Sequence, residues 1–269
     1  MASGGWVLET AVRLAAASIR PEARLAATMR RWMSPSRAAT ALDGGTGSGE
    51  EKVMNRADAE ILWEVASVLA RDAAKVSRTH GRSGRGLPPM LFFTDPDRTP
   101  QPWETAARLP IGAGVVFRHF GRADGRETAL RLRETTRARG GLLLIGLDAE
   151  LAETVGADGV HLPERALGQA AAIRTARPDW RITGAAHARA ALDAADLDAL
   201  VVSPVFPAGG ASADRPALGL PTLADWTGMA RRPLYALGGI HGGNARGLIG
   251  SGACGIAGVS AIRAAFGPD

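Results

Sequence analysis

The feature that most constrains the fold is a regular alternation of short apolar runs and helix-like segments over residues 90–269. Strands that alternate with helices form a parallel sheet, and eight such units close it into a (β/α)8 barrel, the α/β architecture of TIM barrels. An open, doubly wound sheet is the alternative, but the count of eight favours the barrel. The expected strands are Met90–Phe93, Gly114–Arg118, Leu142–Ile145, Gly159–Leu162, Arg181–Gly184, Leu200–Ser203, Leu234–Leu237 and Gly255–Gly258.

Helical patterns fall between these runs and after the last one. The expected helices are Pro102–Leu109, Gly125–Arg137, Ala149–Val155, Arg165–Thr175, Ala188–Ala195, Leu220–Met229, Gly243–Gly250 and Ser260–Phe266.

Residues 1–89 precede the barrel and divide into two stretches. Residues 1–53 are expected to be a disordered or loosely helical extension, because the arginine-rich amphipathic stretch Trp6–Trp32 leads into a Ser/Gly/Ala/Thr-rich linker. A targeting peptide is the alternative for this stretch, but it contains glutamates and lacks an apolar region with a cleavage site. Residues 54–89 predict a helix, over Asn55–Arg78, and a second linker.

Composition excludes several classes of protein. A single cysteine, Cys254, rules out a disulfide framework, and a reducing cytoplasm is the expected location. No stretch is apolar over about 18 residues, so no membrane span is expected. Residues 1–89 hold 13 Lys+Arg against 9 Asp+Glu, which is most of the net charge of +5. The barrel is therefore nearly neutral and is not expected to bind nucleic acid. The sequence leaves open whether the chain forms a homo-oligomer.

Two glycine-containing turns follow the last two expected strands. Ala236–Ile240 and Gly255–Ser260 each end an apolar run in glycine and lead into a helix-like segment. In a (β/α)8 barrel the turns after strands seven and eight, with a helix N-terminus, form a phosphate site, and glycine lets backbone N–H groups approach the anion. The sequence therefore predicts a phosphorylated small-molecule ligand. Its expected contacts are Gly238, Gly239, Gly258, Val259 and Ser260.

Polar side chains at the other strand ends are further candidates, because active sites of this fold lie at the carboxyl ends of the strands. Arg118 ends an apolar run, where a cation is costly unless it is paired, so a ligand contact is expected. His187 follows the fifth run and is the candidate catalytic acid/base, since histidine exchanges protons near neutral pH.

Other residues at these strand ends carry two interpretations. Asp95 is either a ligand contact or a cap for the next helix. His161 is either a ligand contact or a structural histidine. Glu164 follows the fourth strand and is a third possible site residue. His119 and His241 are expected at the surface.

The barrel region contains no lysine, which excludes a Schiff-base aldolase because that mechanism requires the amine. It has no His-Glu-x-x-His or comparable spacing, so no tight zinc site is expected. The chain also lacks the glycine-lysine loop that binds nucleoside triphosphates.

Five motifs, in the same order and at similar spacing, resemble those of the thiamine phosphate synthase/TenI family, over roughly Met90–Phe266. The resemblance implies a (β/α)8 barrel that binds thiazole phosphate. The synthase branch joins thiazole phosphate to a pyrimidine diphosphate with Mg²⁺ and releases pyrophosphate, whereas the TenI branch includes a thiazole tautomerase that needs no metal. The motifs are Gly156–Leu162, Gly184–His187, Ser203–Pro207, Gly238–Ile240 and Gly258–Ile262.

The chain departs from the synthase pattern at the positions that handle diphosphate and metal. The family's Gln-x-Arg-x-Lys reads Val116–Phe120 and keeps only the arginine. Its metal-binding Asn-Asp pair is Gly146-Leu147, and its Gly-Gln-x-Asp run is Pro163–Ala166. Its Thr-x-Thr-Lys loop is Ala208–Ala211. A leaving diphosphate needs such partners to neutralise its charge, so their loss disfavours synthase chemistry.

Three hypotheses follow for a ligand that carries a thiazole phosphate. The first is a TenI-like tautomerase without any cofactor, in which His187 matches the tautomerase's proton carrier. The second is a synthase whose Mg²⁺ site is rebuilt by Glu164, Asp148 or Asp214. The third is a non-catalytic binder of the phosphorylated ligand.

Overall fold

The computed structural model describes residues 48–79, 86–210 and 214–268, and these described residues belong to one compact unit. The expectations for the extension before residue 48 and for most of the second linker, residues 80–85, lie outside the described residues.

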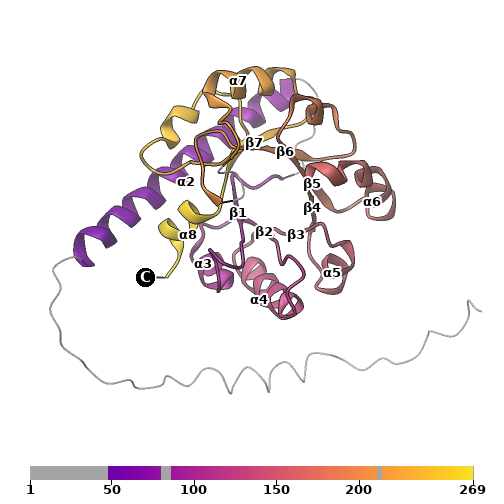
Figure 1. Ribbon diagram of the computed structural model, residues 1–269, viewed down its shortest axis with the longest axis horizontal. Helices are drawn as coiled ribbons and strands as arrows, with labels where there is room; N and C mark the ends of the chain where they lie inside the picture. The colour runs from indigo at the N-terminus through magenta and orange to yellow at the C-terminus, as the bar shows by residue number, and fades with distance from the viewer. Residues whose placement is uncertain (1–47, 80–85, 211–213, 269) are drawn as a thin grey trace, which may run out of the picture. The chain divides into compact units, whose positions relative to one another are not determined.

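Eight parallel strands close into a barrel in sequence order, as predicted (Figure 1). Closure occurs where β1 pairs with β8, so the open-sheet alternative is wrong. The strands are β1 (Met90–Phe93), β2 (Gly114–Phe117), β3 (Leu143–Gly146), β4 (Gly159–Leu162), β5 (Arg181–Ala186), β6 (Ala199–Val202), β7 (Leu234–Leu237) and β8 (Gly255–Gly258).

Side chains fill the barrel interior. Leu91, Leu144 and Tyr235 pack there in one buried cluster, while alternate residues such as Phe92 and Ile145 face the surrounding helices. The Tyr235 hydroxyl donates a hydrogen bond to the carbonyl oxygen of Pro88, at 2.6 Å. Because both faces of each strand are buried, the strands read as continuous apolar runs in the sequence.

The outer layer contains fewer α-helices than expected. The predicted helix over residues 165–175 is divided into a 3₁₀ helix and α6. The predicted helices over residues 188–195 and 243–250 are short 3₁₀ helices. A 3₁₀ helix rises more per residue than an α-helix, so it spans a short connection with few residues. The elements are α3 (Pro102–Arg108), α4 (Gly125–Ala138), α5 (Ala149–Thr154), η1 (Glu164–Gln169), α6 (Ala170–Ala176), η2 (Arg189–Asp193), α7 (Gly219–Met229), η4 (Ala245–Leu248) and α8 (Ser260–Phe266).

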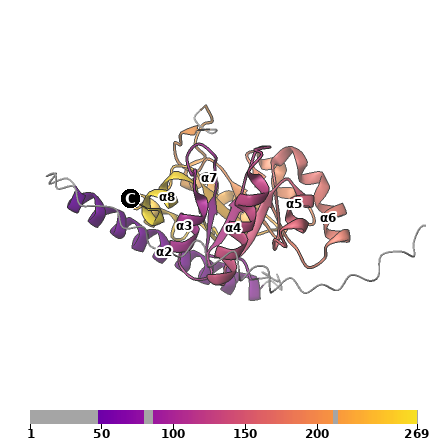
Figure 2. The ribbon, with the colours of Figure 1, turned by 90° about the horizontal axis from the view of Figure 1, so that it is seen from below.

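A long helix, α2 (Ser48–Thr79), precedes the barrel and includes the helix predicted over residues 55–78. Its apolar stripe, Leu62, Val65 and Leu69, is buried in the same core as the outer faces of the strands. It lies alongside α8 in both views (Figures 1 and 2) and also contacts β8 and η4. Since a single 3₁₀ turn connects β7 to β8, α2 covers the part of the barrel wall that a full helix would cover there. Within the described part of the chain, no helix has the length and apolar character that crossing a membrane requires.

Candidate active site

Two adjoining cavities open at the carboxyl ends of the strands. The glycine cavity, of about 470 Å³, is lined by the turns after β7 and β8 and by α8. The histidine cavity, of about 850 Å³, is lined by the ends of β1 to β7 and includes His161 and His187. Both cavities are lined by Arg118 and Leu237, so a single ligand can extend from one into the other.

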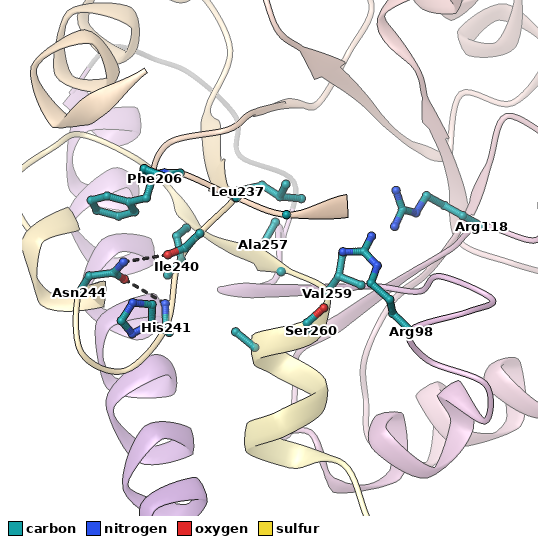
Figure 3. A pocket seen from close by; sticks show the side chains of 17 residues that line it. Arg98, Arg118, Phe206, Leu237, Ile240, His241, Asn244, Ala257, Val259 and Ser260 are labelled. Carbon is teal, nitrogen blue, oxygen red and sulfur yellow. Dashed lines mark hydrogen bonds between the residues drawn. The ribbon is translucent and has the colours of Figure 1, made fainter. Parts of the chain in front are cut away.

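The turn after β7 requires its two glycines. Gly238 and Gly239 have φ angles of +101° and +66°, a region that favours glycine. A Cβ atom on Gly239 would also collide with the carbonyl oxygen of Pro207. Asn244 holds this turn, because its amide donates to the Gly239 carbonyl at 2.8 Å and accepts from the His241 backbone N–H at 2.9 Å (Figure 3). Among the described residues the backbone N–H of Gly239 has no partner.

The turn after β8 leads directly into α8. Gly258, Val259 and Ser260 line the glycine cavity, and no side chain caps the N-terminus of α8. Uncapped N–H groups in a first helical turn attract anions. The structure thus brings together, in the lining of one cavity, all five residues predicted to hold a phosphate.

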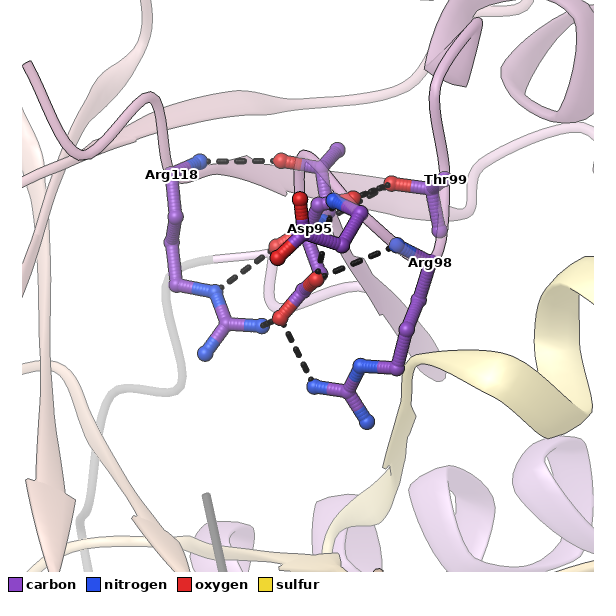
Figure 4. Close-up of polar contacts among 6 residues, drawn as sticks. Asp95, Arg98, Thr99 and Arg118 are labelled. Carbon is purple, nitrogen blue, oxygen red and sulfur yellow. Dashed lines mark hydrogen bonds and ion pairs between the residues drawn. The ribbon is translucent and has the colours of Figure 1, made fainter. Parts of the chain in front are cut away.

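A cluster of charged residues lies beside the glycine cavity (Figure 4). Arg98 Nη2 lies 2.9 Å from Asp95 Oδ2, and Arg118 Nη2 lies 3.9 Å from the same oxygen. Arg118 Nε donates to the Thr94 carbonyl at 2.8 Å. Arg118 Nη2 is buried and has no hydrogen-bond partner in the described part of the chain. The Arg118 side chain lines both cavities, so the rest of its guanidinium is placed to meet an anionic ligand.

Asp95 lines neither cavity. Its Oδ1 atom accepts hydrogen bonds from the backbone N–H groups of Asp97 and Arg98, so it caps its own turn and leaves α3 uncapped. Partial burial acts to raise the pKa of Asp95, but the hydrogen bonds and charge of Arg98 lower it below the ordinary value. Burial lowers the pKa of Arg118 to about 10 against the opposing effect of Asp95, so Arg118 stays protonated at neutral pH. Asp95 thus orients two arginines.

His187 is half-buried in the turn that follows β5, ahead of η2. Its Nδ1 atom lies 3.0 Å from the Ser203 carbonyl oxygen and 3.1 Å from Ser203 Oγ. A carbonyl oxygen only accepts hydrogen bonds, so Nδ1 carries the hydrogen in the neutral ring. The His187 backbone N–H donates to a carboxylate oxygen of Glu164. Within the described residues, Nε2 makes no hydrogen bond and is the nitrogen left for a ligand.

His161 lines the histidine cavity and is held there by structural contacts, so its role as a ligand contact stays a prediction. Its Nδ1 atom lies 2.9 Å from Thr183 Oγ1, and its ring meets Phe93 edge-on with centroids 4.9 Å apart. Complete burial, followed by the charges of Arg118 and His187, lowers the pKa of His161 to about 3. His161 is therefore neutral at physiological pH.

The three carboxylates that could rebuild a magnesium site are not gathered in one cavity, since only Asp148 among them lines the histidine cavity. The described part of the chain has no cluster of three or more His, Cys, Asp or Glu side chains suited to a metal ion. Glu164 is bound to the backbone of His187. Asp148 caps α5 through the Leu151 N–H, at 2.8 Å, and lies 3.2 Å from Nε2 of His119. Asp214 is exposed and lines neither cavity.

Sequence reasoning placed one histidine wrongly and missed two other residues. His119 was expected at the surface, but it is half-buried, lines the histidine cavity and faces Asp148. The turn after β2 holds this side chain, because His119 Nδ1 accepts a hydrogen bond from the Gly121 backbone N–H at 3.1 Å. His241 is exposed, as predicted. Arg98 and Asn244 were not singled out, although Arg98 stands three residues after Asp95, the spacing of a turn that pairs the two.

Comparisons with known proteins agree with this geometry. A family model described as thiamine monophosphate synthase matches residues 104–262. A thiamine-phosphate synthase from Methanoculleus marisnigri is 35% identical over 159 residues, which cover 56% of this chain and 74% of that protein. One from Chlorobium luteolum is 33% identical over 192 residues, which cover 68% of this chain and 88% of that protein.

A solved structure supports the fold. Thiamine phosphate pyrophosphorylase from Pyrococcus furiosus superposes with a TM-score of 0.54 at 23% sequence identity, over 68% of this chain and 95% of that one. The matched residues span most of the barrel and both cavities. The chain therefore belongs to the thiamine monophosphate synthase/TenI family of thiamine biosynthesis enzymes.

Proposed function

We propose that this chain is a metal-independent thiazole tautomerase of the TenI type, which moves a proton within a phosphorylated thiazole carboxylate. The observation that carries the proposal is the orientation of His187. Its Nδ1 atom donates to the Ser203 carbonyl at 3.0 Å, which leaves Nε2 as a base facing the ligand. Glu164 holds the backbone of the same residue, so the ring is fixed from two sides.

The anchors for such a ligand lie in the glycine cavity and where the two cavities adjoin. The phosphate is held in the glycine cavity by the backbone around Gly239 and by Val259 and Ser260. The carboxylate is met by the Arg118 guanidinium, which lines both cavities. Binding at both ends places the thiazole ring between the two cavities.

The proposed reaction is an internal proton transfer. The C–H bond at one carbon of the thiazole unit breaks, its proton passes to His187 Nε2, and the electron pair enters the conjugated system. The imidazolium then returns a proton to another carbon, so the ligand is isomerised without gain or loss of atoms. Arg118 stabilises the negative charge that develops. No diphosphate leaves, so the missing lysines and carboxylates are not needed.

The test follows the interconversion of the two thiazole tautomers by ultraviolet absorbance. His187→Gln should lower the rate by about a hundredfold to ten-thousandfold, the usual contribution of a general acid/base. His119→Gln is the matched control, because it removes another histidine from the same cavity and should change the rate far less. A folded wild-type protein that leaves the tautomers at their uncatalysed rate contradicts the proposal.

Synthase activity is the second candidate, and the names of the sequence relatives favour it. Arg118, Arg165 and Arg215, which line the histidine cavity, are the cations that would then meet the diphosphate. Incubation with thiazole phosphate and pyrimidine diphosphate, with Mg²⁺ or with EDTA, decides between the candidates. Formation of thiamine phosphate that depends on Mg²⁺ supports the synthase. Absence of this product at every Mg²⁺ concentration rules the synthase out. Calorimetric binding of thiazole phosphate without turnover in either assay supports a non-catalytic binder.

A further inference from the structure

Two large apolar side chains are exposed inside the histidine cavity. Phe120 is 68% exposed and Leu147 is 41% exposed, and both line this cavity. Apolar surface that water reaches within a cavity is available to a ligand. Phe120 follows β2 and Leu147 follows β3, so the two side chains come from neighbouring strand ends.

Both residues stand where the synthase pattern has charged groups. Phe120 replaces the lysine of that pattern, and Leu147 replaces its metal-binding aspartate. Their φ angles are +50° and +65°, a left-handed conformation that is costly for bulky residues and mild for asparagine or glycine. The chain thus carries apolar side chains at two positions where the backbone favours small or polar ones.

Two aromatic rings lie beside the Arg118 guanidinium at this cavity. The guanidinium carbon lies 5.4 Å from the ring centroid of Phe93 and 5.4 Å from that of Phe120. These rings interact with the guanidinium and add flat apolar surface beside it. Of the described residues, two acidic ones line this cavity: Asp148, which is already paired with His119, and Glu150 in the first turn of α5.

We infer that Phe120, Leu147 and Phe93 form a subsite for an uncharged aromatic ring carried by the phosphorylated ligand, at the place where a synthase would hold diphosphate. This inference rests on the proposed function, because the phosphate in the glycine cavity fixes the other end of the ligand. The cavities adjoin at Arg118 and Leu237, so a ring attached to the thiazole reaches the subsite. Burial of one such ring strengthens binding by about 10- to 100-fold.

The test compares two probes by calorimetry. The parent probe is hydroxyethyl-methylthiazole phosphate, and the second probe carries a phenyl group on the ring carbon between nitrogen and sulfur. The wild-type protein should bind the phenyl probe at least about tenfold more tightly than the parent. Phe120→Asn and Leu147→Asn should bring this ratio close to one, while both proteins stay folded because asparagine suits a positive φ. Ile111→Asn, at an exposed isoleucine outside both cavities, should keep the wild-type ratio.

A further titration separates the subsite from a diphosphate site. Inorganic pyrophosphate is added to protein already saturated with the parent probe, and no binding is expected at millimolar concentration. Pyrophosphate binding under these conditions overturns the inference, as does a wild-type ratio near one or a ratio that both asparagine variants leave unchanged. If the parent probe binds and only the ratio fails, the proposed function stands. If the parent probe does not bind at all, the proposed function fails, and the inference fails with it.

Discussion

The buried histidine beneath the site should make this protein sensitive to mild acid. Complete burial lowers the pKa of His161 from 6.5 to about 3. Between these two values the unfolded chain binds a proton at this residue and the folded chain does not, so stability is lost as the pH falls. The slope is about 1.4 kcal/mol per pH unit, which gives a loss of about 2 kcal/mol between pH 7 and pH 5.

Substitution of His161 should remove this part of the acid sensitivity. In His161→Asn the amide stands near the position of Nδ1 and keeps the hydrogen bond to Thr183. The variant loses the edge-on contact with Phe93, so its absolute stability falls at every pH. The relevant quantity is therefore the difference in unfolding free energy between pH 7 and pH 5. This difference should be about 2 kcal/mol smaller in the variant than in the wild type.

The assay is urea denaturation of both proteins at the two pH values. His241→Asn, which removes an exposed histidine, controls for the loss of one histidine from the composition. Equal pH dependence of wild type and His161→Asn, within about 0.5 kcal/mol, would refute the reasoning, since additivity between separate sites holds to that precision. That result would mean that His161 gains a proton in the folded protein over this pH range. It would then not be the buried, neutral histidine described above.

Three further predictions follow. Gly239→Ala should weaken binding of thiazole phosphate at least about tenfold by calorimetry, because a Cβ atom there meets the Pro207 carbonyl. Leu62→Ala should lower the unfolding free energy by about 2–5 kcal/mol in urea denaturation, because α2 buries this side chain against the barrel; a loss below about 1 kcal/mol would contradict that packing. Ser203→Ala keeps the carbonyl that fixes His187, so tautomer conversion should slow far less than in His187→Gln.

The barrel could be predicted because its signal is local and repeated. Strands buried on both faces read as apolar runs, and eight of them leave few alternatives. The glycine cavity could also be predicted, because two glycines directly follow the seventh expected strand. In the structure, Gly238 and Gly239 take φ angles that favour glycine. The shortened helices were missed because a segment such as Arg189–Asp193 has the composition of an α-helix, and only the length of the connection makes it 3₁₀.

The rest of the site depends on contacts between loops, which no local pattern encodes. The departures at Phe120 and Leu147 were visible in the sequence, but their positive φ angles and their exposure in one cavity were not. His119 was misplaced for the same reason. Arg118 was predicted as a ligand contact and does line both cavities, whereas Arg98, which faces the same Asp95 carboxylate, comes from a turn whose geometry Asp95 sets.

The central claim is that one ligand places its phosphate in the glycine cavity and its ring at His187. A crystal structure of the complex with thiazole phosphate tests this claim most directly. Phosphate oxygens are expected within hydrogen-bond distance of the Gly239 and Ser260 backbone N–H groups, with a ring atom about 3–3.5 Å from His187 Nε2. A phosphate bound outside this cavity, or a ring beyond reach of His187, would contradict it.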